Sequence, residues 1–141
     1  MQNSIYKFTI QKLKDLGLME ENDSYAFGKF YDKLSAGGAY TFRWSSVDYL
    51  IAANETTLKI FHINKKNGEY MNEYVILKKE QINKLICKRF ALINITKRTK
   101  INIRASEFKL DVLIGEKFHG MKQSENKAAL VKMLKTYFVK H

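Results

Sequence analysis

The side chains in this sequence that could do chemistry are basic, and they are concentrated in its second half. Residues 78–109 carry ten Lys or Arg against two Asp or Glu, whereas residues 1–77 carry nine of each. A local excess of positive charge produces a field that attracts an anionic partner. The candidate residues for binding an anion or a charged partner are Lys84, Lys88, Arg89, Lys97, Arg98, Lys100, Arg104 and Lys109.

Two interpretations of this basic segment remain open. In the first, the cations form a patch that faces phosphate groups, with Tyr or Phe nearby to stack on bases. In the second, they are the solvated face of a sheet. Arg suits bidentate contacts to phosphates, and although the chain has only four Arg beside 21 Lys, three of the four lie in this segment. A working surface of this kind predicts electrostatic attachment that weakens with salt rather than sequence-specific recognition.

Motifs for catalysis, cofactors or metals do not occur in the sequence. His62, His119 and His141 are far apart, and none lies at metal-ligand spacing with a cysteine or carboxylate. Cys87 is the only cysteine, so the chain has no disulfide framework and no partner for this thiol in nucleophilic catalysis. Gly37 and Gly38 follow a predicted helix, which indicates a helix end rather than a phosphate-binding loop. We therefore expect a protein that is not an enzyme and needs no cofactor or metal.

Size and composition indicate one compact folded domain. The chain has 141 residues, 45% of them hydrophobic, which suffices for a real core. No apolar stretch approaches the roughly 18–20 residues that span a bilayer. Lys7, Lys12 and Lys14 interrupt the N-terminal apolar pattern, where a secretory signal needs an unbroken apolar region. We expect a cytoplasmic protein, and the abundance of Lys, Asn and Ile without proline is typical of AT-rich bacterial genomes.

The N-terminal residues have the periodicity of a helix. Ile5, Leu13 and Leu16 lie within one narrow arc of a helical wheel, and Phe8 lies at its margin. The pattern predicts a helix over residues 4–16, with these apolar side chains facing the core.

A second helix is predicted at residues 24–35. Asp23 and Ser24 are suitable N-cap residues ahead of apolar positions spaced at i, i+3, i+4 and i+7. The same residues also allow a strand over residues 25–31, and that alternative stays open.

From residue 39 onward the pattern is that of β-structure. Short runs of β-branched and aromatic residues recur at intervals of about 8–12 residues, as in a sandwich or small barrel. Residues 97–99 are expected at the tip of a hairpin, because alternation on both sides of them puts apolar side chains on one face and polar ones on the other. The predicted strands are 39–44, 49–53, 58–63, 74–77, 82–87, 91–96, 100–105 and 108–114.

The chain ends with a predicted amphipathic helix, which Ser124 is expected to cap. Lys132 and Lys135 point away from its apolar arc, so the arc must dock on an apolar surface such as the open end of a barrel. The apolar arc consists of Leu130, Val131, Leu134, Tyr137 and Phe138.

The order of elements from about residue 38 to 138 resembles the pleckstrin-homology-like (PH-like) domains of bacteria. Residues 49–63 look like the second and third strands of that family, in which an apolar strand runs into a Thr or Asn turn and a second apolar strand follows. Residues 74–86 look like its next unit, a strand, a polar corner and an Ile that returns to the core. The resemblance implies a bent antiparallel barrel capped by the C-terminal helix, and binding of lipid headgroups, peptides or proteins rather than catalysis.

The basic residues depart from the pattern of that family. Its lipid-binding members gather cations around the loop between the first two strands, but residues 45–48 contain no cation and only Arg43 precedes them closely. This departure argues against phosphoinositide-type recognition, and no binding residue transfers from the family to this chain.

These observations predict an α+β, mainly β fold: N-terminal helices, then an antiparallel PH-like barrel or sandwich capped by a C-terminal amphipathic helix. Residues 1–37 are expected to form a helical segment that packs on the core, and residues 38–141 the barrel, as one compact unit. The predicted function is a non-enzymatic binding module for a protein partner or an anionic membrane surface. A small nucleic-acid-binding protein is the alternative, followed by a basic nuclease or toxin-type enzyme, and a homodimer through the N-terminal helices remains open.

Overall fold

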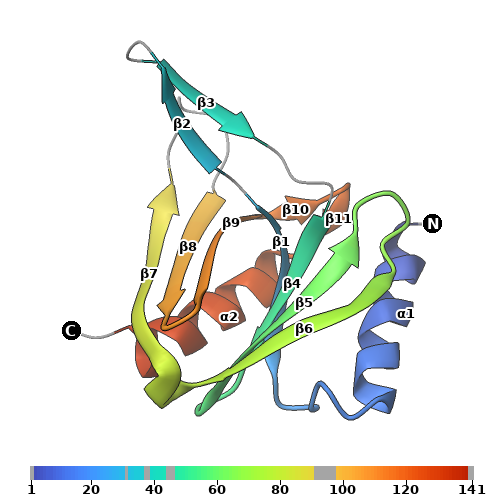
Figure 1. Cartoon of the computed structure of the whole chain (residues 1–141). Coiled ribbons are helices and arrows are strands. Elements are labelled where there is room, and N and C mark those ends of the chain that lie inside the picture. Colours follow the sequence, from blue (N-terminus) through green and yellow to red (C-terminus); the bar gives the residue numbers. More distant parts are fainter. Residues whose placement is uncertain (1, 31, 37–38, 44–46, 91–97, 140–141) are drawn as a thin grey trace.

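The strands form one long antiparallel sheet, with a helix on each of its two faces (Figure 1). The computed structural model describes residues 2–30, 32–36, 39–43, 47–90 and 98–139. Among these residues, neither helix is both long and apolar enough to cross a membrane. The elements in chain order are α1 (Gln2–Asp15), β1 (Ser24–Phe30), β2 (Asp32–Ala36), β3 (Ala39–Arg43), β4 (Val47–Ala53), β5 (Thr57–Asn64), β6 (Tyr70–Lys78), η1 (Lys79–Gln81), β7 (Ile82–Phe90), β8 (Arg98–Ala105), β9 (Phe108–Gly115), β10 (Lys117–Phe118), β11 (Met121–Lys122) and α2 (Ser124–Tyr137).

The main sheet has seven strands in the order β6-β5-β4-β1-β9-β8-β7. β6 and β7 lie at opposite edges of this order, yet only the short η1 turn joins them. Three residues span about 10 Å at most, so the sheet must curl until its two edges approach each other (Figure 1). The expected closed barrel is therefore wrong: within the described chain the structure is a strongly bent, open sheet, because its edge strands do not pair.

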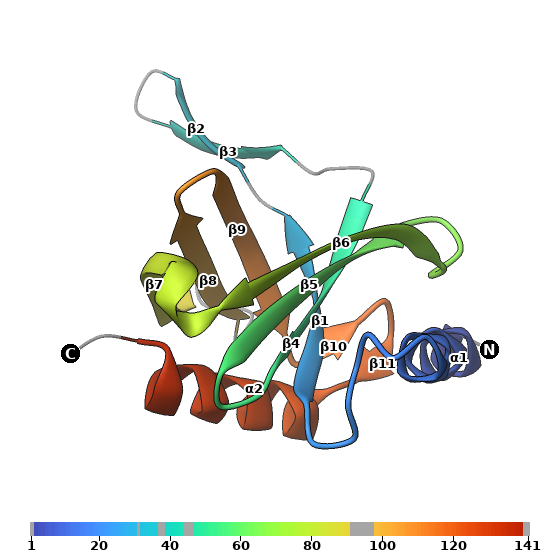
Figure 2. The same ribbon diagram turned by 60° about the horizontal axis from the view of Figure 1, so that its bottom comes forward.

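Each face of the bent sheet has its own apolar core. On the inner face, side chains from all seven strands pack together, and α2 closes this core with Leu130, Leu134 and Phe138. On the outer face, β1, β4 and β5 pack against α1. Figure 2 shows α2 along one side of the sheet and the β2–β3 hairpin projecting from the opposite side.

Most of the strands predicted from the sequence are confirmed. Those expected at 39–44, 49–53, 58–63, 74–77, 82–87, 100–105 and 108–114 correspond to β3 to β9. The strand expected at 91–96 and the glycines at 37 and 38 lie outside the described residues. The expected hairpin tip is wrong for Arg98 and Thr99, because both lie within β8 and pair with Phe90 and Arg89 of β7.

The helix predicted at 24–35 is wrong, and the strand alternative over residues 25–31 describes the structure better. β1 lies in the middle of the sheet, paired with β4 along most of its length and with β9 at its end. Phe27 packs in the outer core and Phe30 against the inner core, which is the alternation of a strand. A spacing of three residues between aromatics fits both structures, and pairing with β4 and β9 decides between them.

Gly28 allows β9 to cross close to β1. A Cβ atom at this position would lie 2.6 Å from Val112 Cγ2 and 3.0 Å from the Leu113 carbonyl oxygen. Only glycine permits this approach without displacing β9. The bend of the sheet thus depends on a residue that carries no side chain.

The first helix is confirmed, but its predicted apolar arc is buried only at Leu13. Ile5, Phe8 and Leu16 are exposed, whereas Tyr6 and Leu13 are buried against the sheet. The Thr9 hydroxyl, also buried, donates to the Gly68 carbonyl oxygen of the β5–β6 turn at 2.7 Å and lies on the same side of the helix as Tyr6 and Leu13.

Asp23 does not cap a helix, in contrast to the prediction. Its carboxylate is buried and forms an ion pair with Lys59 of β5 at 2.8 Å. It also accepts hydrogen bonds from the Glu20 N–H and the Asn54 side chain. This cluster fixes the connection between α1 and β1 against the sheet.

The C-terminal helix is confirmed together with its apolar face. Leu130, Leu134 and Phe138 are buried, while Lys132 and Lys135 are exposed. Ser124 is the first helical residue rather than the cap, and the N-cap position belongs to Gln123.

The Gln123 side chain completes the hydrogen bonding of β1 where β9 diverges from it. Its Oε1 accepts from the Phe27 N–H at 2.9 Å. Its Nε2 donates to the carbonyl oxygens of Phe27 at 2.9 Å and Gly115 at 3.0 Å. Gln123 is only 2% exposed, so water cannot easily replace these bonds. One side chain therefore serves as the missing strand partner of β1.

We expect Gln123→Leu to lower the free energy of unfolding by about 2–4 kcal/mol, because three buried backbone groups lose their partner. Urea denaturation measures this change. Gln11→Leu is the matched control, since Gln11 is exposed and bonds only Asp15 of its own helix; its change should stay within about 0.5 kcal/mol. Equal effects of the two substitutions would contradict the role of Gln123.

Candidate anion-binding site

The outer face of β7, β8 and β9 is basic. Along β8, Thr99, Ile101 and Ile103 are buried, and the side chains between them lie on the opposite face. The register of the three strands places six of the eight predicted residues on this opposite face. The basic face, as named here, consists of Lys84, Lys88, Arg98, Lys100, Arg104 and Lys109.

Cations lie directly opposite one another across these strands. Lys88 of β7 pairs with Lys100 of β8, and Arg104 of β8 lies between Lys84 of β7 and Lys109 of β9. Like charges in directly opposed positions destabilise a sheet by up to about 1 kcal/mol per pair.

Arg104 is the member of the basic face whose charge is compensated. Its guanidinium forms an ion pair with Asp111 of β9 at 2.8 Å, and Asn102 donates to the same carboxylate oxygen at 2.7 Å. Within the part of the chain that the structure describes, Lys84, Lys88, Lys100 and Lys109 have no carboxylate within ion-pair distance. Four ammonium groups on this face therefore remain for an external anion.

Of the other two predicted residues, Arg89 does not join the basic face. Arg89 pairs with Thr99, so it has the parity of the buried side chains and is exposed only because it lies near the end of β7. Lys97 lies outside the described residues.

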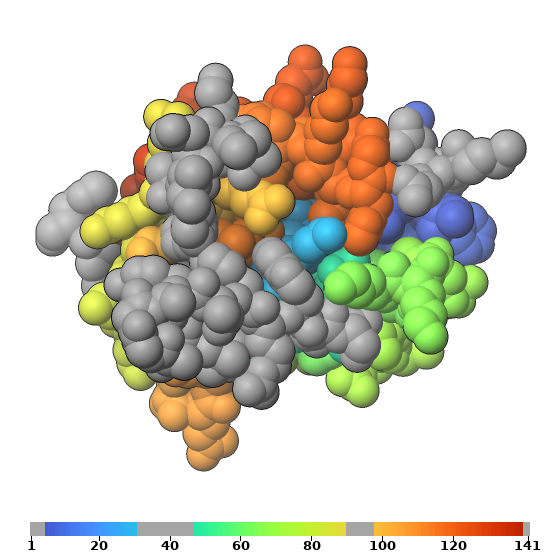
Figure 3. Space-filling view, turned by 90° about the horizontal axis from the view of Figure 1, so that it is seen from above, coloured from blue at the N-terminus to red at the C-terminus, as the bar shows by residue number. Residues whose placement is uncertain are grey.

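A pocket of about 220 Å³ lies next to the basic face. It is formed where the ends of β1 and β9 meet the start of β8 and the β10–β11 turn, and Figure 3 shows the light-blue end of β1 beside the orange segment that contains β9 to β11. Leu113 connects it to the basic face, because this residue pairs with Lys100 on one side and with Lys29 on the other. The pocket is lined by Lys29, Arg98, Leu113, Gly115, Lys117, Phe118 and His119.

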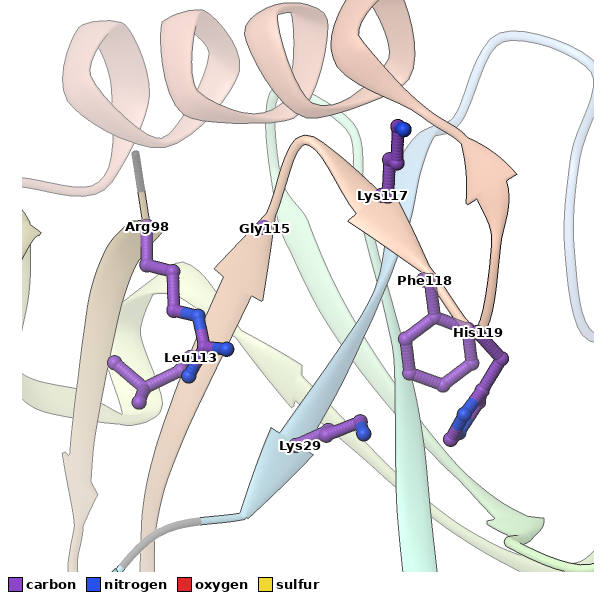
Figure 4. A pocket seen from close by; sticks show the side chains of 7 residues that line it. All are labelled: Lys29, Arg98, Leu113, Gly115, Lys117, Phe118 and His119. Carbon is purple, nitrogen blue, oxygen red and sulfur yellow. The ribbon is translucent and has the colours of Figure 1, made fainter. Parts of the chain in front are cut away.

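Two of the three cations in the pocket extend into it. Figure 4 shows the side chains of Arg98 and Lys29 reaching toward the space between Leu113 and His119, whereas that of Lys117 extends away. Among the described residues, no carboxylate lies within ion-pair distance of Arg98 or Lys29. The pocket thus combines two uncompensated cations with apolar walls.

His119 is held in place on one side of the pocket. Its Nε2 lies 2.8 Å from Oδ2 of Asp48, whose side chain is only 3% exposed. His119 and Gly120 both have positive φ, 48° and 83°, which is the backbone of a two-residue type I′ hairpin turn between β10 and β11. The imidazole is therefore fixed both by its backbone and by a buried carboxylate.

The Asp48 carboxylate also affects a tyrosine of α1. Burial, and second the negative charge of Asp48, raise the pKa of the Tyr6 hydroxyl to about 12. The Tyr6 ring lies parallel to the His119 imidazole, with 6.5 Å between the ring centroids. The outer core and the rim of the pocket thus share one cluster of polar groups.

The remaining candidate groups do not form a reactive site. Burial raises the pKa of the Cys87 thiol, with smaller opposite effects from two lysines, so the reactive thiolate is disfavoured. His62 lies 3.1 Å from the Glu73 carboxylate at the surface of β5 and β6. In the described residues, His, Cys, Asp and Glu do not cluster as metal ligands.

The sequence identified the basic face but not the pocket. Lys29 and Lys117 lie outside the basic segment, and His119 was one of three scattered histidines without an apparent partner. The separation of 71 positions between Asp48 and His119 leaves no local signal of their contact. The pairing of β1 with β9, which brings Lys29 next to Leu113, was equally hidden by the predicted helix at 24–35.

Comparisons with known proteins find similarity among solved structures and none at the level of sequence families. No protein-family model matches the sequence, and no curated protein matches it. Among solved structures, the hSac2 domain from human phosphoinositide phosphatase Sac2 is similar, with a TM-score of 0.46 and 13% sequence identity over 96% of this chain and 83% of that chain. Because a TM-score below 0.5 does not establish a shared fold, nothing about the ligand of this chain follows from it.

We expect Lys88→Glu to raise the free energy of unfolding by about 0.2–1 kcal/mol, because the substitution replaces a like-charge pair with Lys100 by an attractive pair. Urea denaturation at low salt measures the change. Lys66→Glu, on an exposed turn, is a control with the same change in net charge. A gain no greater than that of the control would show that the two ammonium groups do not interact.

The Tyr6 hydroxyl should make folding stability sensitive to alkaline pH. Its pKa is about 12 in the folded state and near 10 in the unfolded chain, so its contribution is complete below pH 10 and is lost as the pH rises toward 12. We expect Tyr6→Phe to make this decline shallower in denaturation measured from pH 9 to 12. A decline as steep as that of the unmodified protein would contradict this role of the Tyr6 hydroxyl.

Proposed function

We propose that the protein is a non-enzymatic, PH-like binding module of the cytoplasm that attaches to an anionic membrane surface through its basic face. The observation that carries the proposal is the set of four uncompensated ammonium groups, those of Lys84, Lys88, Lys100 and Lys109, on one open sheet face. Lys88 opposes Lys100 at a cost in stability, which an anionic partner would reverse.

An extended anionic surface suits the geometry of this face. The ammonium groups come from three adjacent strands, so they spread over a broad area instead of converging on one point. Lys side chains are flexible and act as point charges, which is sufficient for a fluid layer of lipid headgroups. Each Lys or Arg near an anionic leaflet contributes about 1 kcal/mol, and the cytoplasmic leaflet carries such lipids.

A nucleic acid fits the same face less well. Proteins that bind single strands stack bases on aromatic side chains beside the cations. Between the cations on the outer face of β7 to β9 lie Ile86, Asn102, Asp111 and Leu113, and the register adds one aromatic residue, Phe90, at the end of β7. Phe108 is partly buried and packs against the inner core, on the side of the sheet opposite to the basic face.

The resemblance of the strand pattern to PH-like domains also supports binding over catalysis. The chain has a bent antiparallel sheet in place of the expected closed barrel, and the expected C-terminal helix packs against its inner face. The basic face, however, lies on the outer side of β7 to β9. The proposed attachment therefore uses this chain's own charge distribution and does not depend on a site inherited from the family.

Sedimentation with vesicles tests this function. We expect the protein to bind vesicles of phosphatidylcholine with phosphatidylglycerol at low salt, and to lose most of that binding at 0.5 M salt because exposed charges are screened. Lys88→Gln with Lys100→Gln should weaken binding roughly tenfold to thirtyfold, at about 1 kcal/mol per residue.

The control variant, Lys12→Gln with Lys66→Gln, removes the same charge from exposed positions on α1 and the β5–β6 turn. It should retain binding within about threefold. Equal losses in both variants would show that net charge and not the basic face determines attachment. Tighter binding to duplex or single-stranded DNA than to vesicles, at the same salt concentration, would favour the nucleic-acid alternative.

A further inference from the structure

We propose that the pocket between β1, β8 and the β10–β11 turn binds the phosphate of a phosphomonoester lipid, and so selects monoester over diester headgroups. This inference rests on the proposed function, because the basic face first brings the protein to the anionic surface. Arg98 belongs to both the basic face and the pocket lining. A headgroup held in the pocket would therefore lie at the edge of the membrane-facing surface.

Arg98 provides the directional contact. Its guanidinium is planar and always charged, and it offers a fork of N–H donors that matches two oxygens of one phosphate. The side chain extends into the pocket, as Figure 4 shows, and no carboxylate among the described residues engages it. The fork is thus available for an external anion.

Lys29 provides a second cation from the other side of the pocket. It lies at the end of β1, next to Leu113 of β9. Because Leu113 also neighbours Lys100, an apolar side chain separates the Lys29 ammonium from the basic face. When two phosphate oxygens accept hydrogen bonds from the Arg98 guanidinium, the third terminal oxygen can accept one from the Lys29 ammonium.

This arrangement distinguishes a phosphomonoester from a phosphodiester. A monoester phosphate carries about −1.5 to −2 charges near neutral pH and has three terminal oxygens. The positive charges of Arg98 and Lys29 match that negative charge. The Arg98 guanidinium can bind two of the three terminal oxygens, and the Lys29 ammonium can bind the third. A diester has one negative charge and two terminal oxygens, so it leaves one of the two cations without a partner.

The walls of the pocket limit what can enter with the phosphate. Its volume of about 220 Å³ is below the range of about 300–1,000 Å³ of sites for drug-sized ligands. Leu113 and Phe118 are buried and offer no hydrogen bonds from their side chains. His119 cannot easily withdraw, because Asp48 and its turn conformation hold it. A compact headgroup fits this space better than a large polar one.

The test compares two kinds of vesicle with equal surface potential, containing phosphatidic acid as the monoester lipid or phosphatidylglycerol as the diester lipid. We expect the protein to bind the phosphatidic acid vesicles about tenfold more tightly, as one charge-assisted hydrogen bond would give. Arg98→Lys keeps the charge but lacks the fork. It should abolish most of the preference, because it weakens binding to phosphatidic acid vesicles far more than binding to phosphatidylglycerol vesicles.

Lys29→Gln should also remove the preference, with only the small loss on phosphatidylglycerol that one missing charge causes. Lys109→Gln, on the basic face but outside the pocket, should weaken binding to both vesicles alike. Thermal unfolding of each variant confirms that it is folded. Inorganic phosphate at constant ionic strength should displace the protein from phosphatidic acid vesicles more readily than from phosphatidylglycerol vesicles, because it competes for the pocket alone.

Equal binding of the unmodified protein to both vesicles would contradict the proposed selection of monoester headgroups by the pocket, while leaving the proposed membrane attachment intact. A preference that survives Arg98→Lys would also overturn it, since the recognition would then lie elsewhere. Absence of binding to either vesicle at low salt would instead refute the proposed function itself. If inorganic phosphate competes equally on both vesicles, it acts on the general surface charge, which again contradicts a specific pocket.

Discussion

The structure depends on how β1 changes partners. At its start β1 pairs only with β4, and at its end it also pairs with β9, so one strand joins the two halves of a sheet that must bend sharply between them. Gly28 lets the two backbones cross without a clash, and the Gln123 side chain binds the Phe27 backbone where β9 has already diverged. The inner core, the position of α2 and the pocket at the end of β1 all depend on this crossing.

Local sequence patterns correctly predicted those helices and strands whose structure depends mainly on residues close in the sequence. The strands from β3 to β9 and the apolar face of α2 follow from alternation and helical periodicity, which the core of the structure enforces. The prediction of a second helix was wrong because the aromatic residues of β1 have a spacing that fits either a helix or a strand. Only pairing with strands distant in the sequence, such as β9, distinguishes the two. The buried face of α1 was predicted only in part for a related reason: Leu13 is buried as its place in the apolar arc indicates, whereas Thr9 is buried because it binds the distant β5–β6 turn.

The same distinction applies to the candidate site. The basic face was predictable because it consists of successive residues on adjacent hairpin strands, whose parity can be read from the sequence. The pocket was not, because Lys29, Arg98 and His119 come from three separate elements and the contact of His119 with Asp48 spans half of the chain. The charged side chains of β7 also have a second effect: β7 is an edge strand, and its lysines discourage pairing with another chain.

The β2–β3 hairpin projects from the main sheet, and the connection between β1 and β4 does not require it. β1 and β4 are hydrogen-bonded neighbours, and Lys29 pairs with Asp48 beside the place where the hairpin begins and ends. A tight turn would be enough to connect two such strands. The hairpin is therefore an insertion in the architectural sense, and its length and composition are free to diverge during evolution while the bent sheet, both helices and the charged surface keep their geometry.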